Sequence, residues 1–144
     1  MNEEFKHSFK NISHESLGLS VYNCGIQRCG PNYAWGPAVR DHFLIHYIIS
    51  GSGIFQDGEN QYSLHAGDGF LVVPSRLVTY TADEIDPWEY SWVGFNGADA
   101  QRFISFTGLS ANNPVFHYDK DNLLQTQLQT IIDAVGPAPC NEAR

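Results

Sequence analysis

Hydrophobic residues up to about residue 97 form short runs that turn-forming residues separate. Between residues 17 and 97 the runs are rich in β-branched and aromatic side chains, and glycine, proline, asparagine or aspartate lies between one run and the next. Short runs of this composition are typical of strands in all-β sandwiches and barrels. We therefore expect roughly seven short strands in this part of the chain, arranged as an antiparallel β-barrel.

Several of these strands and turns can be placed directly. Residues 42–50, HFLIHYIIS, are the most β-like run of the chain. Asp57-Gly58 lies between two further runs and is a hairpin signal. Residues 65–69, HAGDG, predict a second turn, and the buried strand after it is expected to end at Pro74.

The region before the most β-like run is less regular. Residues 18–29, GLSVYNCGIQRC, predict a first strand or a pair of strands. Residues 32–40, NYAWGPAVR, are expected to form a loop, because Gly36-Pro37 cannot continue regular pairing.

The periodicity changes after the predicted barrel. Residues 98–108 have apolar positions compatible with a short helix ended by a glycine. Residues 119–135 carry the longest helical pattern, in which Asp119 or Asp121 can cap the first turn and residues 136–139, GPAP, stop the helix. Its apolar residues recur every three or four positions and form one stripe, which either packs against the barrel or forms the seam of a dimer. The stripe consists of Leu124, Leu128, Ile131, Ile132 and Val135.

Composition narrows the class of protein. The formal net charge of −8 argues against DNA binding by this chain itself, because cationic side chains are needed to displace counterions from phosphates. A hydrophobic content of 42% is that of a folded globular domain. No run approaches the roughly 20 apolar residues that a membrane helix needs, so we expect no membrane contact. The cysteines, Cys24, Cys29 and Cys140, are odd in number, which indicates reduced thiols in a cytoplasmic protein.

Candidate metal ligands and nucleophiles do not form a catalytic pattern. His42 and His46 are separated by about 13 Å along a strand, which is too far for both to bind one metal ion. Cys24 and Cys29 have no second cysteine pair or neighbouring base in sequence, and a GxSxG motif is missing. We therefore expect no metal, no cofactor and no catalytic residue, and we interpret both histidines as structural.

Aromatic side chains with polar groups are the best candidates for a binding site. Trp88, Tyr90 and Trp92 alternate, so a strand would place all three on one face. Such rings offer a flat apolar surface to the C–H face of a sugar, while phenol and indole groups can hydrogen-bond its hydroxyls. The pattern therefore predicts a sugar pocket. The other residues assigned to this pocket are Trp35, Tyr80 and Arg40.

Longer segments resemble a known family. The segment AGDGFLVVP, residues 66–74, in a β-rich chain followed by helices resembles the cupin fold, a jelly-roll barrel. Residues 24–55, and residues 62–97 with the motif DPWEYSWVGFNG, resemble the N-terminal effector-binding and dimerisation domain of AraC-family transcription regulators. They are most similar to the branch, common in Gram-positive bacteria, that controls operons for α-galactosides and related oligosaccharides.

The resemblance implies a cupin-like barrel that holds a sugar. In the arabinose-responsive member of the family an arginine, a tyrosine and a tryptophan bind the sugar, and the matching positions here are Arg40, Tyr80 and Trp92. Tyr90 stands where that member has a histidine, and Gln27 lies roughly where it has a threonine. The effector therefore need not be arabinose, and an α-galactoside is a candidate.

The resemblance also implies how the chain is organised. Residues 1–16 would be an N-terminal arm, residues 17–97 the sugar-binding barrel, and residues 98–144 a helical dimerisation segment. Family members read DNA through a C-terminal pair of helix-turn-helix motifs, which this sequence does not contain. We therefore expect the chain to bind a sugar and form a homodimer, and to contact DNA only through a domain outside it.

Two other functions are compatible with a sugar-binding barrel. A cupin-fold sugar isomerase or epimerase would need a metal, or a histidine and a tyrosine acting as acid and base, inside the barrel. A stand-alone carbohydrate-binding module would bind sugar without a change in oligomeric state. The regulator domain is our prediction, and we expect no enzymatic activity.

Overall fold

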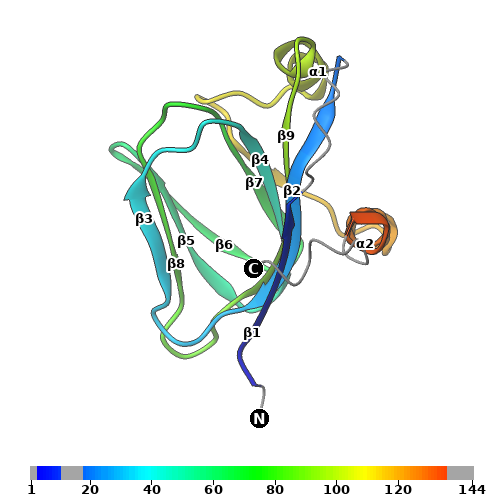
Figure 1. The fold of residues 1–144 in the computed structure, drawn as a ribbon. Helices are drawn as coiled ribbons and strands as arrows, with labels where there is room; N and C mark the ends of the chain where they lie inside the picture. The colour runs from blue at the N-terminus through cyan, green and yellow to red at the C-terminus, as the bar shows by residue number, and fades with distance from the viewer. Residues whose placement is uncertain (1–2, 11–17, 136–144) are drawn as a thin grey trace.

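The computed structural model describes residues 3–10 and 18–135. Its strands are β1 (Phe5–Lys10), β2 (Ser20–Arg28), β3 (Ala34–Ala38), β4 (Phe43–Ser50), β5 (Ser52–Asp57), β6 (Asn60–His65), β7 (Asp68–Val72), β8 (Val78–Ala82), β9 (Glu89–Asn96) and β10 (Val115–His117). Its helices are α1 (Ala100–Thr107) and α2 (Leu123–Val135). A larger sheet in the order β1-β2-β9-β4-β7-β10 faces a smaller sheet in the order β3-β8-β5-β6, with both helices outside (Figure 1). The predicted cupin-like barrel with helices after it is confirmed.

The first predicted turn joins two paired strands, and the second joins the smaller sheet to the larger one. β5 pairs with β6, with Asp57 opposite Asn60, which confirms the hairpin signal. In the next turn the carboxylate of Asp68 accepts a hydrogen bond from the backbone N–H of His65 (2.9 Å). An aspartate that bonds to nearby backbone in this way favours a turn over a continued strand, which explains the HAGDG signal.

The loop prediction for residues 32–40 is wrong at its centre. Residues Ala34 to Ala38 form β3, which pairs with β8 and places Trp35 opposite Tyr80. The register shifts between Trp35 and Ala38, around the proline. β3 is at the edge of the smaller sheet, where a strand needs hydrogen bonds on one side only and therefore tolerates a proline.

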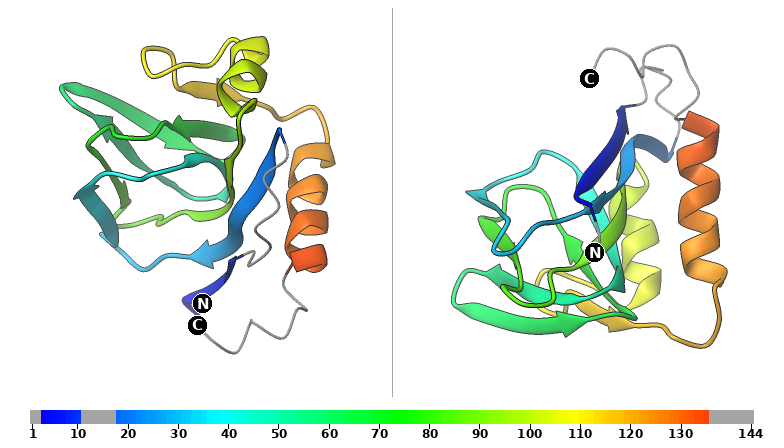
Figure 2. Two further views of the ribbon diagram at one scale, coloured as in Figure 1. Left: turned by 45° about the horizontal axis from the view of Figure 1, so that its top comes forward. Right: turned by 90° about the horizontal axis from the view of Figure 1, so that it is seen from below.

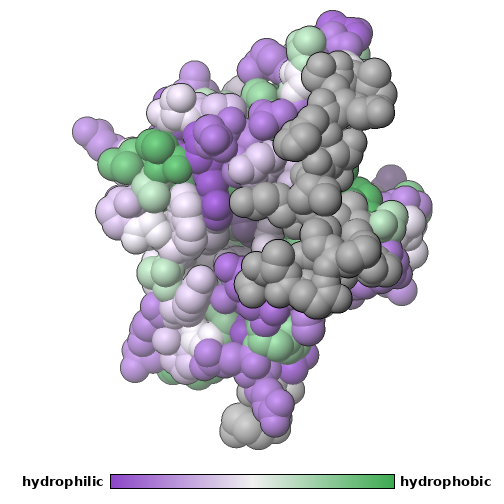
Figure 3. All heavy atoms as spheres, in the orientation of Figure 1, coloured by the Kyte–Doolittle hydropathy of each residue, from purple (hydrophilic) through white to green (hydrophobic). Residues whose placement is uncertain are grey.

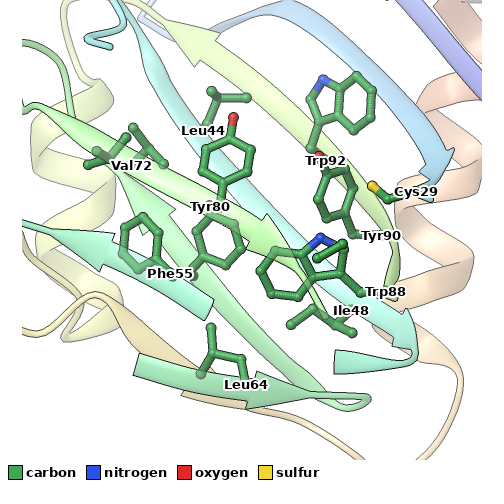
Figure 4. Packing of buried hydrophobic residues seen from close by; sticks show 13 residues of the cluster. Cys29, Leu44, Ile48, Phe55, Leu64, Val72, Tyr80, Trp88, Tyr90 and Trp92 are labelled. Carbon is green, nitrogen blue, oxygen red and sulfur yellow. The ribbon is translucent and has the colours of Figure 1, made fainter. Parts of the chain in front are cut away.

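Alternation along the start of β9 places Tyr90 and Trp92 inside the barrel, together with Trp88 just before the strand. Trp88, Tyr90 and Trp92 are buried on one face of the strand, as predicted. Figure 4 shows them one after another along the strand, with Tyr80 of the smaller sheet opposite. Tyr80 and Tyr90 meet edge to face with their ring centroids 6.2 Å apart. The inner faces of the two sheets thus share one aromatic core.

Helix α1 covers one end of the outer face of the larger sheet. Ala100 and Ile104 pack there against Phe43, Leu71 and Phe95. The helix ends at a glycine, residue 108, with φ of 81°. A residue with positive φ at this position is a common end of a helix, and glycine adopts it without a steric penalty. The predicted short helix and its stop are confirmed.

Helix α2 packs against its own sheet. It contacts β9, β2 and β1, and Figure 2 shows it alongside these strands, outside the barrel. Leu128 and Ile132, from the middle of the predicted stripe, are buried there. The carboxylate of Asp121 accepts a hydrogen bond from the backbone N–H of Leu123 (2.8 Å), so of the two capping candidates Asp121 is used. Of the two alternatives for the stripe, packing against the barrel is thus the one that Leu128 and Ile132 follow within this chain.

The predicted N-terminal arm contributes a strand. Its residues Phe5 to Lys10 form β1, which pairs along β2 at the edge of the larger sheet. The rest of the arm lies outside the described residues, apart from Glu3 and Glu4. The expected helix stop at residues 136–139 and Cys140 also lie outside them.

The surface shows scattered apolar side chains. In Figure 3 most of the visible side chains are hydrophilic or intermediate in hydropathy, and the apolar ones form small separate patches. Single exposed apolar residues of this kind are normal on a folded domain. Neither helix of the described residues has the length and apolar character needed to cross a membrane.

Candidate functional site

A small cavity lies between the two sheets. Six of the seven residues that the sequence assigned to a ligand site contribute to its wall, and the seventh, Trp88, is buried in the core and does not line it. Its volume is about 20 Å³, which is room for roughly one water molecule. The cavity is lined by Lys6, Gln27, Tyr33, Trp35, Arg40, His46, Tyr80, Tyr90 and Trp92.

Strand register brings the residues of one wall together. In the larger sheet Gln27 of β2 is opposite Tyr90 of β9, and Trp92 of β9 is opposite both Gly25 of β2 and His46 of β4. Because alternate residues share a face, these side chains all point into the barrel. The indole of Trp92 lies directly over Gly25, where a Cβ atom would be 2.5 Å from Cζ2 of the ring. Glycine at this position therefore makes the packing of Trp92 possible.

The opposite wall consists of Trp35 and Tyr80 with Arg40. The two rings are stacked, with centroids 5.2 Å apart and an angle of 18° between their planes. The guanidinium of Arg40, from the loop between β3 and β4, lies 3.8 Å from the centroid of the Trp35 ring. Its Nη2 donates a hydrogen bond to the hydroxyl of Tyr80 (2.8 Å). These contacts hold Arg40 against this wall of the cavity.

His46 is a lining residue that the sequence analysis missed. Its ring is stacked on Phe70 with centroids 4.6 Å apart and also meets Tyr90 edge-on. Burial, with the charges of Arg40 and Lys6, holds the pKa of His46 well below its usual range, so the ring is neutral. Its Nδ1 is buried and has no hydrogen-bond partner among the described residues. His46 thus packs in the core, as a structural histidine would, but its Nδ1 is not hydrogen-bonded there.

Lys6 and Tyr33 also line the cavity without having been predicted. Lys6 belongs to β1, and its ammonium lies 5.9 Å from the centroid of the Trp92 ring. Tyr33 comes just before β3, in the segment that was expected to be a loop. Neither residue carries a sequence signal of its own, because each reaches the cavity only through strand pairing.

The polar side chains that line the cavity are uncharged, apart from Lys6 and Arg40. Burial raises the pKa of the Tyr80 hydroxyl to about 12. Burial also raises the pKa of Tyr90, whose hydroxyl interacts with the thiol of Cys29. Both phenols therefore remain protonated at neutral pH and can donate hydrogen bonds to a ligand.

The thiols and histidines do not form a reactive centre. Burial raises the pKa values of Cys24 and of Cys29 to about 11, so neither is a thiolate at neutral pH. Within residues 3–10 and 18–135, no three His, Cys, Asp or Glu side chains are arranged to hold a metal ion. His42, at the start of β4, lies outside the cavity, and its Nδ1 is 2.8 Å from the carboxylate of Asp41.

Operon regulators are similar to this chain. It is 34% identical over 124 residues to the Msm operon regulatory protein of Streptococcus mutans serotype c, a match that covers 86% of this chain and 44% of that protein. It is 37% identical over 90 residues to the raffinose operon transcriptional regulatory protein RafR of Pediococcus pentosaceus, over 61% of this chain and 32% of that protein. These relatives are regulators and not enzymes, as predicted. The chain spans less than half of their length.

A solved structure and a protein family both match this chain. A cupin 2 conserved barrel domain protein from Salinispora arenicola CNS-205 superposes with a TM-score of 0.53 at 13% identity, over 72% of this chain and 84% of that one. At this identity the likeness shows the barrel fold alone. Residues 20–142 match the family described as AraC-like ligand binding domain. The chain therefore belongs to the family of AraC-like ligand-binding domains.

Proposed function

We propose that this chain is the effector-binding domain of a sugar-responsive transcription regulator, and that the sugar binds between Trp35 and Trp92. The observation that carries the proposal is that all the predicted site residues except Trp88 line one cavity inside the barrel. The relatives support it, since one of them regulates a raffinose operon.

The cavity offers both kinds of contact that a sugar needs. Trp35 and Trp92 supply flat apolar surfaces for the C–H face of a sugar ring. The protonated hydroxyls of Tyr80 and Tyr90 donate and accept hydrogen bonds, and Arg40 donates only. A molecule that carries hydroxyls around an apolar ring face matches this set.

Sugar binding requires the cavity to open. Its volume of about 20 Å³ is far below the roughly 300–1,000 Å³ of a typical small-molecule site. Arg40 covers one face of the Trp35 ring and is bonded to Tyr80, so moving it exposes both groups to a ligand. The sugar therefore selects an open arrangement over the closed one, and it shifts the population by the difference in its affinity for the two.

The regulatory role implies partners beyond the sugar. DNA binding does not suit this acidic chain, so a domain outside it contacts the operator. Two copies of the chain form a homodimer through the helical segment. Because Leu128 and Ile132 of the α2 stripe pack against the chain's own sheet, we place the dimer contact on exposed apolar side chains of the helical segment. These are Phe103, Phe106 and Leu123.

Calorimetric titration of the purified domain with galactose, melibiose, raffinose, sucrose, arabinose and glucose tests the proposal. We expect saturable binding of at least one of these sugars, which is recovered chemically unchanged. Trp92→Ala removes the stacking surface, worth about 1 kcal/mol beyond its buried area, and should weaken binding about tenfold. Tyr80→Phe removes a buried hydrogen-bonding hydroxyl and should weaken binding by about the same factor.

Tyr62→Phe is the matched control for Tyr80→Phe. Tyr62 belongs to β6 and does not line the cavity, so its variant should bind sugar as the unmodified chain does. No heat with any sugar, or full affinity in both Trp92→Ala and Tyr80→Phe, would contradict the proposal. Conversion of the bound sugar to an isomer or epimer would show an enzyme instead.

A further inference from the structure

A cluster of ionisable side chains lies where β10 meets the turn between β6 and β7. In the larger sheet His117 of β10 is opposite Asp68 of β7. Nδ1 of the His117 ring is 2.6 Å from Oδ1 of Asp68, and Nε2 of the same ring is 2.9 Å from Oδ2 of Asp119. Both ring nitrogens of His117 thus face a carboxylate.

This geometry calls for a proton on each nitrogen of the ring. A neutral imidazole has one N–H group, so it can donate to one carboxylate only, and its other nitrogen would point a lone pair at the second carboxylate. The imidazolium has two N–H groups and can donate to both carboxylates. The position of His117 between Asp68 and Asp119 therefore fits the charged form of the histidine.

Asp68 is held in place by the barrel. Its Oδ2 accepts a hydrogen bond from the backbone N–H of His65 (2.9 Å) and lies 3.1 Å from Nδ1 of the His65 ring. The His117 ring lies over Gly67 of the same turn, where a Cβ atom would be 3.0 Å from Cε1 of the ring. The turn therefore provides a fixed anion and the room that the ring of His117 needs.

Asp119 belongs to the connection that leads from β10 to α2. Figure 2 shows this connection leaving the barrel and reaching the helix outside it. At its start the backbone N–H of Tyr118 donates to the carbonyl of Gly67, and the carbonyl of Tyr118 accepts from the hydroxyl of Tyr47 (2.7 Å each). At its end Asp121 caps α2. The contact between His117 and Asp119 lies between these two points and adds a third attachment.

The charges around His117 favour its protonated form. Hydrogen bonds to Asp68 and to Asp119 raise the pKa of His117 above its usual value. The hydrogen bond from His117 lowers the pKa of Asp119. Between these two pKa values both partners are charged. The other titratable groups on the surrounding elements are His65 of β6, Tyr47 of β4, and Tyr118, Lys120 and Asp121 of the connection.

We infer that His117 is a proton-dependent clamp that fastens the connection between the barrel and α2 to the β6–β7 turn. Protonated His117 donates to both carboxylates, and neutral His117 can donate to one. The released carboxylate is that of Asp119, because its side chain is 72% exposed, whereas that of Asp68 is 13% exposed and is held by the turn. The first turn of α2 is therefore held more firmly at low pH than at high pH.

The raised pKa fixes the direction of this effect. A histidine whose folded pKa lies above the unfolded value of about 6.5 contributes its full stabilisation below that value. The contribution is lost as the pH rises through the folded pKa. Because His117 and Asp119 are both accessible to water, salt should screen their attraction. None of these steps requires the barrel to bind a sugar.

Amide hydrogen exchange at about pH 6 and about pH 8 tests the clamp. Each rate is divided by that of an unstructured peptide at the same pH, which removes the intrinsic effect of pH. The reporter is the backbone N–H of Thr126, which donates to the carbonyl of Asn122 in the first turn of α2 (2.8 Å). We expect its protection to fall about two- to fivefold from the lower to the higher pH, as loss of an exposed ion pair would give. The fall should shrink in about 1 M salt.

Three variants isolate the contribution of His117. His117→Gln carries no titratable group and should give the same protection at both pH values. His117→Arg keeps a positive charge with several N–H donors and should remain protected at both. His7→Gln removes an exposed histidine of β1, at the opposite edge of the larger sheet, and as the matched control it should keep the fall of the unmodified chain.

An NMR titration of the His117 ring in the unmodified chain tests the same inference without a variant. We expect a midpoint above about 6.5. A midpoint at or below that value would overturn the clamp. Equal protection of Thr126 at both pH values in the unmodified chain would do the same, as would a fall of unchanged size in folded His117→Gln.

Discussion

Individual side chains in the cavity are well packed yet incompletely hydrogen-bonded. The ring of His46 stacks on Phe70, while its Nδ1 is buried without a partner among the described residues. Leaving a buried polar atom unpaired costs about 1–3 kcal/mol. A ligand that pairs with this atom recovers part of that free energy on binding. The unpaired nitrogen of His46 therefore lowers the stability of the unliganded domain and raises its affinity for a ligand.

His46→Phe separates these two effects. Phenylalanine keeps the stacking on Phe70 and removes the unpaired nitrogen, so the free energy of unfolding should stay the same or rise by about 1 kcal/mol. Sugar affinity should fall about tenfold, because the hydrogen bond to the ligand is lost. Chemical denaturation and calorimetry measure the two quantities. Lower stability together with unchanged affinity would show that His46 serves only the core.

Residue types predicted part of the site, and strand register determined the rest. Trp35, Tyr80 and Trp92 could be predicted because rings with polar groups are typical of sugar sites, whatever their exact pairing. His46 could not be predicted, since its role depends on lying opposite Trp92 in the sheet. Lys6 likewise reaches Trp92 only because β1 pairs with β2.

Among the elements, helix α2 shows most clearly how context decides the role of a pattern. Its apolar stripe is equally suited to a partner helix and to its own sheet, because both present apolar surface to one face of the helix. In the structure Leu128 and Ile132 are buried against the larger sheet, so the stripe contributes to the stability of a single chain.

Leu128→Ala tests the packing of α2. Removing a buried leucine side chain should lower the free energy of unfolding by about 2–5 kcal/mol. The loss should be the same at low and high protein concentration, because the contact lies within one chain. Leu77→Ala, a matched change at a leucine between β7 and β8 that is 59% exposed, should have little effect on unfolding. A loss for Leu128→Ala that grows on dilution would indicate a dimer seam.

Strands with a strong hydrophobic pattern or a hairpin signal were easier to predict than the other strands at sheet edges. The run from Phe43 to Ser50 and the Asp57-Gly58 hairpin carry their own signals, and both are confirmed. β1, β3 and β10 are edge strands, and their sequences resemble loops. They are strands because a neighbouring strand offers hydrogen bonds along one side, which no local pattern reports.

At the scale of the whole molecule, the space between the two sheets is too small for a sugar in this arrangement. The cavity there holds roughly one water molecule, and Arg40 on its wall is bonded to Tyr80. The proposed sensor therefore works by a change from a closed to an open arrangement, in which the sugar replaces the bond between Arg40 and Tyr80.

The crystal structure of the domain with the saccharide that titration selects tests this claim most directly. We expect one sugar ring between Trp35 and Trp92, Arg40 moved away from the Tyr80 hydroxyl, and a hydrogen bond from the sugar to Nδ1 of His46. A saccharide bound elsewhere on the molecule, with Arg40 still bonded to Tyr80 across a closed cavity, would contradict the assignment of this cavity as the sensor site.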